Sequence, residues 1–412
     1  MATTDFFRRS VLSNGVRVVS SHRAGTALAA VKLFFKVGSR HDASHPGIAH
    51  FQEHVLFDTP PASPAHPLAQ AIEAIGGEAN AVTTREYTAL QAVVLSRDVE
   101  VAVHRCADLL APGPLDPAVV ERERRIILEE IALASDSYQI IWDLFLQALW
   151  NGDPFALPVT GTRESVSALT TAELTVHRSR YEAANGIVLA AAGEVDHDAL
   201  VRITETRLGT LRPDALPADR QLPSSPIGRA FIEKDTHHTH LAVGVKATAM
   251  GDPRRYAVRL LSIILGHGAS SRLHRALRTD RGLVYSVSSV TMSYADRGYL
   301  AVYTTCAPEN TARVSALILD ELTRVQRHGV SHAELLTAQT TYEGSLARNF
   351  ETVLSLASII GLEELLTHVE PFADGLARIR NVTADEVQEA AARLLTTEHY
   401  AIAAIGRRWE DA

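Results

Sequence analysis

The chain has little cysteine, no long apolar run and no excess of positive charge, and each shortage excludes a class of protein. Only Cys106 and Cys306 occur among 412 residues, too few and too far apart for a disulfide framework. No apolar run reaches the roughly 20 residues that a membrane-spanning helix needs. The first nine residues lack the apolar core and the cleavage site of a secretory signal. We therefore expect a cytoplasmic protein with no membrane partner.

The charge balance also argues against a nucleic-acid partner. The formal net charge is -8, with 46% hydrophobic and 21% charged residues, which is the composition of a globular protein. A net negative charge repels phosphate backbones and acidic lipid surfaces. Because 412 residues exceed one ordinary domain, we expect two or more domains.

The most informative residues form the sequence His50-Phe51-Gln52-Glu53-His54. On a helix, residues three and four apart share one face, so two imidazoles and one carboxylate would lie side by side. Two neutral histidines are good zinc ligands, and a neighbouring carboxylate can take a proton from a water at the metal. Glu before the second His is the order of the inverted zinc peptidases. Such a short motif also arises by chance, and the alternative is a surface helix turn with solvated side chains.

A catalytic zinc needs a third protein ligand, and a second predicted helix carries candidate carboxylates. Residues 117–131 mix apolar and charged positions in the pattern of an amphipathic helix, and Asp116 is the expected N-cap. Glu123 and Glu130 are seven residues apart, which is two helical turns, so they face the same way. We interpret the other acids of this helix as a solvated face.

The two motifs together resemble those of the M16 (pitrilysin-like, M16B-type) metallopeptidases. In that family, H-x-x-E-H is followed at about this interval by an acidic helix that supplies the third ligand. The resemblance implies that His50, His54 and Glu130 bind one zinc ion per chain. It also implies that Glu53 is the catalytic base, and that Glu123 is a supporting acid which orients a ligand.

Further segments extend the resemblance over nearly the whole chain. Residues 76–81 are similar to a family segment on an edge strand that holds the substrate backbone by β-addition, with Asn80 and Ala81 in the contacting positions. Arg278 and Tyr285 have the spacing of a family pair that reaches towards the zinc site. The resemblance implies that they contact the substrate and the developing oxyanion. The alternatives are that Asn80 is an ordinary turn residue, that Arg278 forms a salt bridge, and that Tyr285 is a structural residue of a strand.

The sequence departs from the family pattern at a few positions near the zinc motif. Gln52 stands where the family usually has Leu, Val55 where Met is common, and Asp58-Thr59 where a basic-Gly-Thr run is usual. None of these is an expected ligand. We expect the differences to affect the lining of the substrate subsites.

A proline-rich polar stretch at residues 209–228 predicts a domain boundary. It separates residues 1–208, with the zinc motif, from residues 229–412, with Arg278 and Tyr285. Each half reads as strand, helix, strands and helices. The predicted fold class is α+β, with two homologous α/β-sandwich domains of the pitrilysin/LuxS-like metallohydrolase kind. The resemblance implies that one chain is half of a dimeric clamshell, either a homodimer or a heterodimer with a related M16 subunit.

Two other features are expected to be structural. The tract His237-His238-x-His240 looks like a metal-binding run, but it opens a predicted strand, and such tracts are weak evidence of metal binding. Trp142 and Trp150 lie on an apolar helix face and are expected in the core.

The sequence therefore predicts a zinc-dependent endopeptidase that hydrolyses internal bonds of peptides or small unfolded polypeptides. One alternative is a dedicated processing protease that removes a leader peptide together with a paralogous partner subunit. Another is a non-catalytic structural relative. The complete set of His50, Glu53, His54 and Glu130 argues against the last, because such relatives usually lose ligands.

Overall fold

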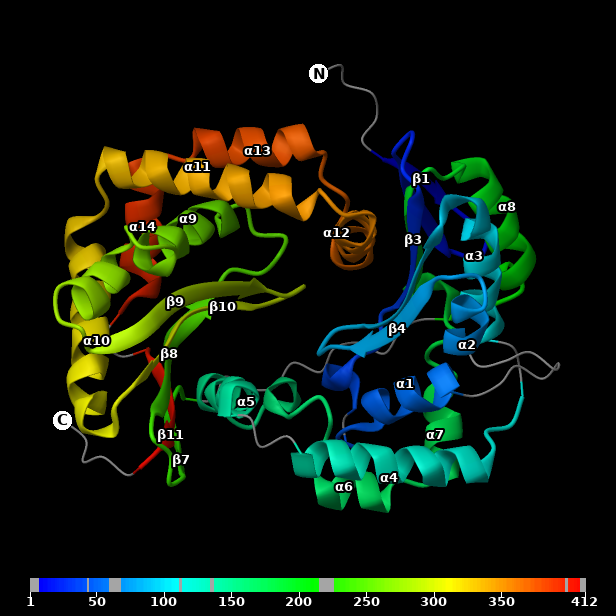
Figure 1. Ribbon diagram of the computed structural model, residues 1–412, viewed down its shortest axis with the longest axis horizontal. Coiled ribbons are helices and arrows are strands. Elements are labelled where there is room, and N and C mark those ends of the chain that lie inside the picture. Colours follow the sequence, from blue (N-terminus) through cyan, green and yellow to red (C-terminus); the bar gives the residue numbers. More distant parts are fainter. Residues whose placement is uncertain are drawn as a thin grey trace. The chain divides into compact units, whose positions relative to one another are not determined.

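The computed structural model describes residues 7–42, 44–58, 68–110, 113–133, 137–214, 226–396 and 399–407. The chain forms two compact units. Unit 1 comprises residues 1–133, 157–221 and 347–372, and unit 2 comprises residues 134–156, 222–346 and 373–412. Each unit contains one mixed β-sheet with helices packed on it (Figure 1), as the α+β prediction requires.

The sheet of unit 1 has the strand order β1-β2-β6-β3-β5-β4, so that β4 lies at one edge. Its strands are β1 (Arg8–Val11), β2 (Arg17–His22), β3 (Leu28–Phe35), β4 (Glu78–Thr83), β5 (Thr88–Leu95) and β6 (Ile187–Gly193). Strands β2 and β6 are parallel, and the other neighbours are antiparallel. A turn at Asn14-Gly15 joins β1 to β2, and Gly15 has the positive φ of 95° that such a turn favours.

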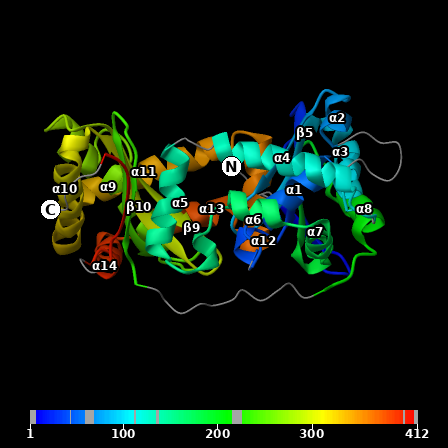
Figure 2. The ribbon, with the colours of Figure 1, turned by 90° about the horizontal axis from the view of Figure 1, so that it is seen from below.

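Period-two alternation along β3 sends apolar side chains to both faces of this sheet. Leu33 and Phe35 enter a core with helices α3 and α8, whereas Phe34 enters a second core with helix α12. Figures 1 and 2 show α3 and α8 lying together. The helices of unit 1 are α1 (Ile48–Asp58), α2 (Leu68–Glu73), α3 (Val99–Asp108), α4 (Pro117–Leu133), α6 (Arg163–Ala168), α7 (Thr171–Arg178), α8 (His197–Leu208) and α12 (Val353–Leu366).

Unit 2 repeats the plan with a sheet of order β7-β11-β8-β10-β9. Its strands are β7 (Arg229–Glu233), β8 (Thr239–Ala247), β9 (Val284–Ser293), β10 (Gly298–Cys306) and β11 (Ala401–Gly406). Its helices are α5 (Ser137–Leu149), α9 (Arg255–Gly266), the π-helix η5 (His274–Thr279), α10 (Thr311–His328), α11 (His332–Asn349), α13 (Phe372–Asn381) and α14 (Ala384–Leu394). One face of the sheet packs on α9, α10 and α14, and the other packs on α5.

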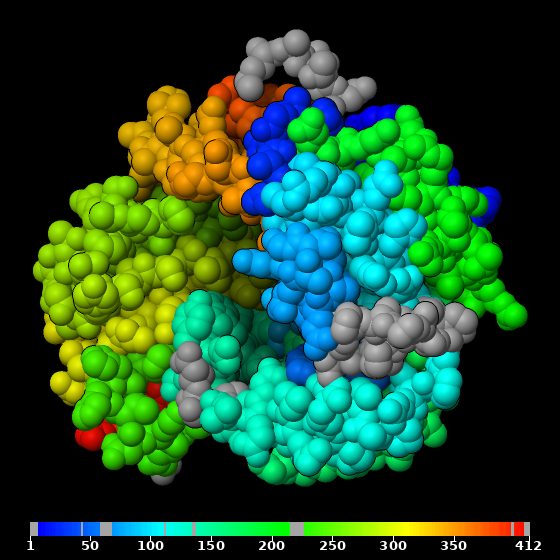
Figure 3. All heavy atoms as spheres, turned by 45° about the vertical axis from the view of Figure 1, so that its right-hand side comes forward, coloured from blue at the N-terminus to red at the C-terminus, as the bar shows by residue number. Residues whose placement is uncertain are grey.

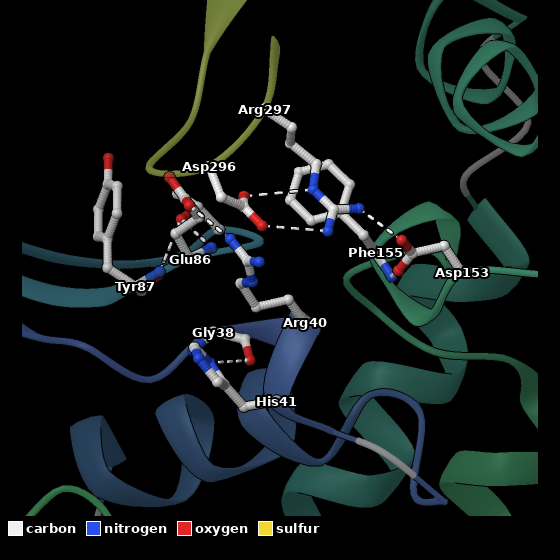
Figure 4. Close-up of polar contacts among 10 residues, drawn as sticks. Gly38, Arg40, His41, Glu86, Tyr87, Asp153, Phe155, Asp296 and Arg297 are labelled. Atoms are coloured by element: carbon white, nitrogen blue, oxygen red, sulfur yellow. Dashed lines mark hydrogen bonds and ion pairs between the residues drawn. The ribbon is translucent and has the colours of Figure 1, made fainter. Parts of the chain in front are cut away.

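An aromatic cluster fills the space between α5 and its sheet. Trp150 is 6% exposed, and the ring centroids of Trp142 and Tyr299 lie 6.2 Å apart, which places both tryptophans in this core as predicted. At the border of the cluster, the Arg297 guanidinium lies 4.8 Å above the Phe155 ring and pairs with Asp153 (Figure 4).

The predicted boundary at residues 209–228 lies partly outside the described residues, because nothing between 215 and 225 is described. The division into residues 1–208 and 229–412 stays a prediction. The compact units are not two contiguous halves, since residues 134–156 belong to unit 2 and residues 347–372 to unit 1. Within the described residues, no helix is both long enough and apolar enough to cross a membrane.

Candidate metal centre

A buried acid in the segment before α1, Asp42, bonds the start of that helix and was not expected from the sequence. The Asp42 carboxylate, 4% exposed, accepts hydrogen bonds from the Gly47 N–H at 2.8 Å and the Ala49 N–H at 3.3 Å. These bonds satisfy free N–H groups at the start of the helix. Burial raises the pKa of Asp42 well above its ordinary value. The Tyr181 hydroxyl donates to the Ala49 carbonyl at 3.2 Å. Both backbone polar groups of Ala49, in the first turn of α1, therefore have a side-chain partner.

The apolar side of α1 fixes which way its polar side faces. Ile48, Phe51 and Val55 are buried in a core shared with α4, α6 and α7. Helical spacing then directs His50, Glu53 and His54 to another face. Those three line a pocket together with residues of β4 and α4.

The structure brings the three expected metal ligands together. The Nε2 atoms of His50 and His54 each lie 3.7 Å from Oε2 of Glu130. The candidate ligand atoms of the three residues all lie within 4.8 Å of one another. Ligand atoms at about 2.1 Å from a tetrahedral zinc stand about 3.4 Å apart, so this arrangement nearly fits the ion already. Among the described residues, it is the one group of three or more His, Cys, Asp or Glu side chains with that property.

Glu123 takes the supporting position that the resemblance implied. Its side chain, 4% exposed, places Oε2 at 3.3 Å from Nδ1 of His54, and its other oxygen accepts from Nε of Arg122 at 3.1 Å. A carboxylate at Nδ1 favours the tautomer with the proton there, which leaves the lone pair of Nε2 free to bind a metal. Helix α4, turquoise at the lower right of Figure 3, thus supplies both acids, Glu123 buried and Glu130 exposed.

His50 is suited to bind a metal in its neutral form. Burial, and to a smaller degree the neighbouring His54, lowers the pKa of His50 to about 3. No proton therefore competes for Nε2 near neutral pH. Its Nδ1 atom is buried and has no hydrogen-bond partner among the described residues, in contrast to Nδ1 of His54.

Glu53 lines the same pocket as these candidate ligands. Its Oε2 accepts a hydrogen bond from the Thr83 hydroxyl at 2.6 Å. Burial raises the pKa of Glu53, and the Thr83 bond opposes that rise. Thr83 was not expected at the site, although alternation along the strand places it on the same face as Ala79 and Ala81.

The pocket at this centre measures about 650 Å³ and is bordered by the edge strand β4. Asn80 and Ala81 line it, and Oδ1 of Asn80 accepts the N–H of Ala81 at 2.8 Å. The two glycines before β4 are required for the path that the backbone takes into this strand. Gly76 has a φ of +75°, and a Cβ on Gly77 would come within 2.8 Å of the Val93 carbonyl oxygen. The role of Asn80 and Ala81 in holding a substrate stays a prediction.

A second tie holds the β4–β5 hairpin to the segment before α1. The N–H groups of Ser39 and Arg40 donate to the carbonyls of Thr84 and Arg85 at 3.0 and 2.9 Å. Arg40 also pairs with Glu86 at 2.7 Å, and both side chains are at most 6% exposed (Figure 4). The edge strand and the ligand-bearing helix are therefore fixed to one another.

Two departures from the family pattern do not reach the pocket. Gln52 and Val55 are both fully buried, and neither lines it. The expectation that they alter the substrate subsites is therefore wrong, because they face the interior behind the ligands. Thr59 lies outside the described residues, as does the side chain of Asp58.

Arg278 and Tyr285 lie together in unit 2. Arg278 belongs to η5, Tyr285 to β9, and the guanidinium carbon is 5.2 Å from the centroid of the tyrosine ring. Tyr285 is 82% exposed. Their action at the metal centre stays a prediction. In the histidine tract, His240 lies on β8 and its Nδ1 is 2.8 Å from the Tyr303 hydroxyl.

Comparison with known proteins supports the same reading. Two family profiles match the chain: Insulinase (Peptidase family M16) over residues 17–163, and Peptidase M16 inactive domain over residues 168–342. An uncharacterized zinc protease of Mycobacterium tuberculosis is 37% identical over 407 residues, which cover 97% of this chain and 93% of the relative. An uncharacterized zinc protease of Bacillus subtilis is 29% identical over 400 residues, or 97% and 98% of the two chains.

Solved structures share the fold at low sequence identity. A protease from Helicobacter pylori superposes with a TM-score of 0.90 at 20% identity, over 97% of this chain and 99% of the other. A peptidase M16 inactive domain from Pseudomonas fluorescens gives a TM-score of 0.89 at 19% identity, over 98% and 99%. A chain of complex III from Candida albicans gives 0.85 at 21% identity, over 97% and 95%. These likenesses establish the two-sheet architecture.

Proposed function

Because the chain belongs to peptidase family M16, we propose that it is a zinc-dependent endopeptidase that hydrolyses internal bonds of peptides or small unfolded polypeptides. The observation that carries the proposal is the convergence of His50, His54 and Glu130, with Glu53 beside them. Two imidazoles and one carboxylate form a donor set that zinc peptidases use. His50, His54 and Glu130 would hold the zinc, which would supply a Lewis acid for the scissile carbonyl and for the attacking water.

The residues of this chain then divide the work. Glu53 accepts the proton of the attacking water and passes it to the leaving amine, and its raised pKa suits both transfers. Thr83 fixes the carboxylate that does this. Glu123 holds His54 in the ligating tautomer. The edge strand β4 offers its backbone to an extended peptide beside the metal.

The non-catalytic alternative is the weaker reading. One similar structure carries the description of an inactive domain, and another belongs to a complex III assembly. This chain, however, retains every ligand, the base and the acid that orients His54 in contact geometry. A subunit with only a scaffold role has no need of two imidazoles and a carboxylate whose ligand atoms lie within 4.8 Å of one another.

We also propose that two chains, or one chain and a related subunit, enclose the substrate, and that the protein acts in the cytoplasm. The family resemblance supports the pairing, and two buried free thiols are consistent with a reducing compartment. Light scattering at assay concentration tests the pairing. Full activity from a monomer would rule it out. Activity that appears only on mixing with a second subunit would instead favour a dedicated processing protease.

The experiment that tests the proposed function is hydrolysis of a mixed quenched-fluorescent peptide library. Glu53→Gln should lower the rate by about 10²–10⁴-fold, because it removes the base without removing a ligand. Zinc content should stay at the wild-type level. Glu129→Gln, an exposed neighbour of the ligand Glu130, is the matched control and should cut at the wild-type rate. Equal cleavage by Glu53→Gln and the wild type would refute the assignment of the base.

A further inference from the structure

Unit 2 contains a second pocket, of about 820 Å³, that shares no residue with the metal centre. It lies between the segment around η5, helix α10 and the start of α11. Its volume is within the range of small-molecule sites. Neither the resemblance nor the proposed peptidase chemistry gives it a role.

Arg272, Glu321 and Glu334 are less exposed charges of the lining; they form its floor and compensate one another. Arg272 donates to both oxygens of Glu334, at 2.6 and 2.9 Å, and to the Gly329 carbonyl at 2.9 Å. Buried Glu321 lies 3.8 Å from Arg272 and 3.4 Å from Arg324. Each of these carboxylates already has a guanidinium partner, so the floor gives shape to the site and adds little net charge.

The rim carries charges of both signs that are not compensated. Arg275, Asp280 and Asp320 are exposed, and none forms an ion pair within the part of the chain that is described. Arg281 has no carboxylate partner there either, but it donates to the Ala276 carbonyl at 2.8 Å, which orients its guanidinium. Two guanidiniums and two carboxylates without an ion partner thus border the pocket, beside His328 and beside Arg324, whose guanidinium pairs with Glu321.

Apolar side chains complete the lining. Leu317 and Val330 are partly buried and pack against the core of unit 2, and both also border the pocket. A ligand placed there would meet two cations, two anions and an apolar wall. Asp280 and Asp320 would repel a simple anion. Arg275 and Arg281 would likewise repel a simple cation.

We propose that this pocket binds a small zwitterion, a free amino acid or very short peptide with an apolar side chain. Its carboxylate would pair with Arg275 and Arg281, since guanidinium matches carboxylate geometry. Its ammonium would pair with Asp320, and its side chain would cover Leu317. The products of peptide hydrolysis belong to this chemical class, but binding at this pocket does not depend on the proposed activity.

Calorimetric titration of the full chain with leucine tests the proposal. The titration is made with metal removed by chelation, so that the metal centre does not contribute. N-acetylleucine, which lacks the ammonium, leucinamide, which lacks the carboxylate, and inorganic phosphate are the comparison probes. Leucine should bind and each comparison probe should bind at least about 10-fold more weakly, since each probe lacks one of the charge-assisted interactions.

Variants locate the site. Arg275→Gln and Asp320→Asn should each weaken leucine binding by about 10-fold or more. Arg327→Gln, an exposed arginine of α10 outside the pocket, is the matched control and should bind as the wild type does. Both exposed positions tolerate substitution, and an unchanged melting temperature checks this. The proposal is overturned if leucine gives no heat at millimolar concentration, if phosphate or N-acetylleucine binds equally well, or if the two variants leave the affinity unchanged.

Discussion

The two units share a strand-then-helix arrangement, but the helices of the two units bury different kinds of side chain. In unit 1 the long strand β3 is followed by α1, and in unit 2 the long strand β8 is followed by α9. Helix α9 buries an almost wholly apolar set that includes Leu260, Leu261 and Leu265. Helix α1 buries His50, Gln52 and Glu53 among its apolar residues. The scaffold alone therefore does not create a metal centre.

What separates the units is the supply of partners for buried polar groups. A buried polar atom without a hydrogen bond is costly, so each polar side chain of α1 needs a neighbour. Helix α4 provides Glu123 and Glu130, and β4 provides Thr83. Gln52 has no such neighbour among the described residues, and its two amide atoms are buried without partners.

The largest expected effect follows from removing the ligand that α4 contributes. Glu130→Gln should lower zinc affinity by more than the roughly 10–100-fold that is typical of losing a residue which only orients a ligand. Glu129→Gln should leave the affinity unchanged, because that side chain is exposed on another face. Competition with a chromophoric chelator measures both. Equal zinc affinities of Glu130→Gln and Glu129→Gln would show that the two histidines bind the ion without Glu130.

Removing the orienting acid should have the next largest effect. Glu123→Gln should weaken zinc binding by about 10–100-fold, because the amide holds the His54 tautomer less firmly. The same competition assay reports it. A loss as severe as that of Glu130→Gln would mean that Glu123 is itself a ligand.

Making α1 more like α9 should stabilise the fold. Gln52→Leu replaces a fully buried amide whose polar atoms lack partners, so the free energy of unfolding should rise by about 1–3 kcal/mol. Denaturant titration measures the change, with peptide hydrolysis as a check that the pocket is intact. A destabilised variant would indicate that an internal water satisfies the amide.

A buried histidine of α7 should make unit 1 sensitive to acid. Burial lowers the pKa of His177 from 6.5 to about 3, so the unfolded chain binds a proton that the folded chain does not. This group therefore costs stability as pH falls below 6.5, by about 2 kcal/mol at pH 5. His177→Phe keeps a ring beside Tyr181 and should remove that part of the pH dependence. Melting curves of both proteins at pH 8 and pH 5 test it, and parallel losses would contradict the assignment.

The stability of unit 2 should fall at a lower pH than that of unit 1, and by a smaller amount. The Arg272 bond lowers the pKa of Glu334 from 4.5 to about 2, so its stabilisation is present above pH 4.5 and is lost towards pH 2. The side chain is 31% exposed, and screening should keep the contribution below about 1 kcal/mol. In Glu334→Gln, the free energy of unfolding should fall less steeply between pH 4.5 and pH 2 than in the wild type. A variant with an unchanged acid limb would show that solvent screening removes the effect.

Much of the candidate centre followed from local sequence patterns. Helical spacing placed His50, Glu53 and His54 on one face, and a two-turn interval placed Glu123 and Glu130 together. Asp116 caps α4 as expected, because its carboxylate accepts the Ala118 N–H at 2.8 Å. The structure agrees with these predictions since each depends only on the geometry of a single helix.

Contacts between elements were less accessible. Thr83 of β4 bonds Glu53 of α1, and no spacing rule connects segments that the fold alone brings together. The same limit explains why Gln52 was assigned to the substrate subsites. Its position on α1 was known, but the neighbours on that face were not.

The sequence by itself determined the ligand types, their helical faces and the presence of two similar α+β halves. These depend on residue identity and on backbone periodicities. The tertiary structure decided that α4 lies against α1 so that Glu130 meets His50 and His54, and that residues 137–156 and 347–372 each pack with the unit formed mainly by the other half of the chain. Such pairings depend on long-range burial of apolar surface, which no local pattern records.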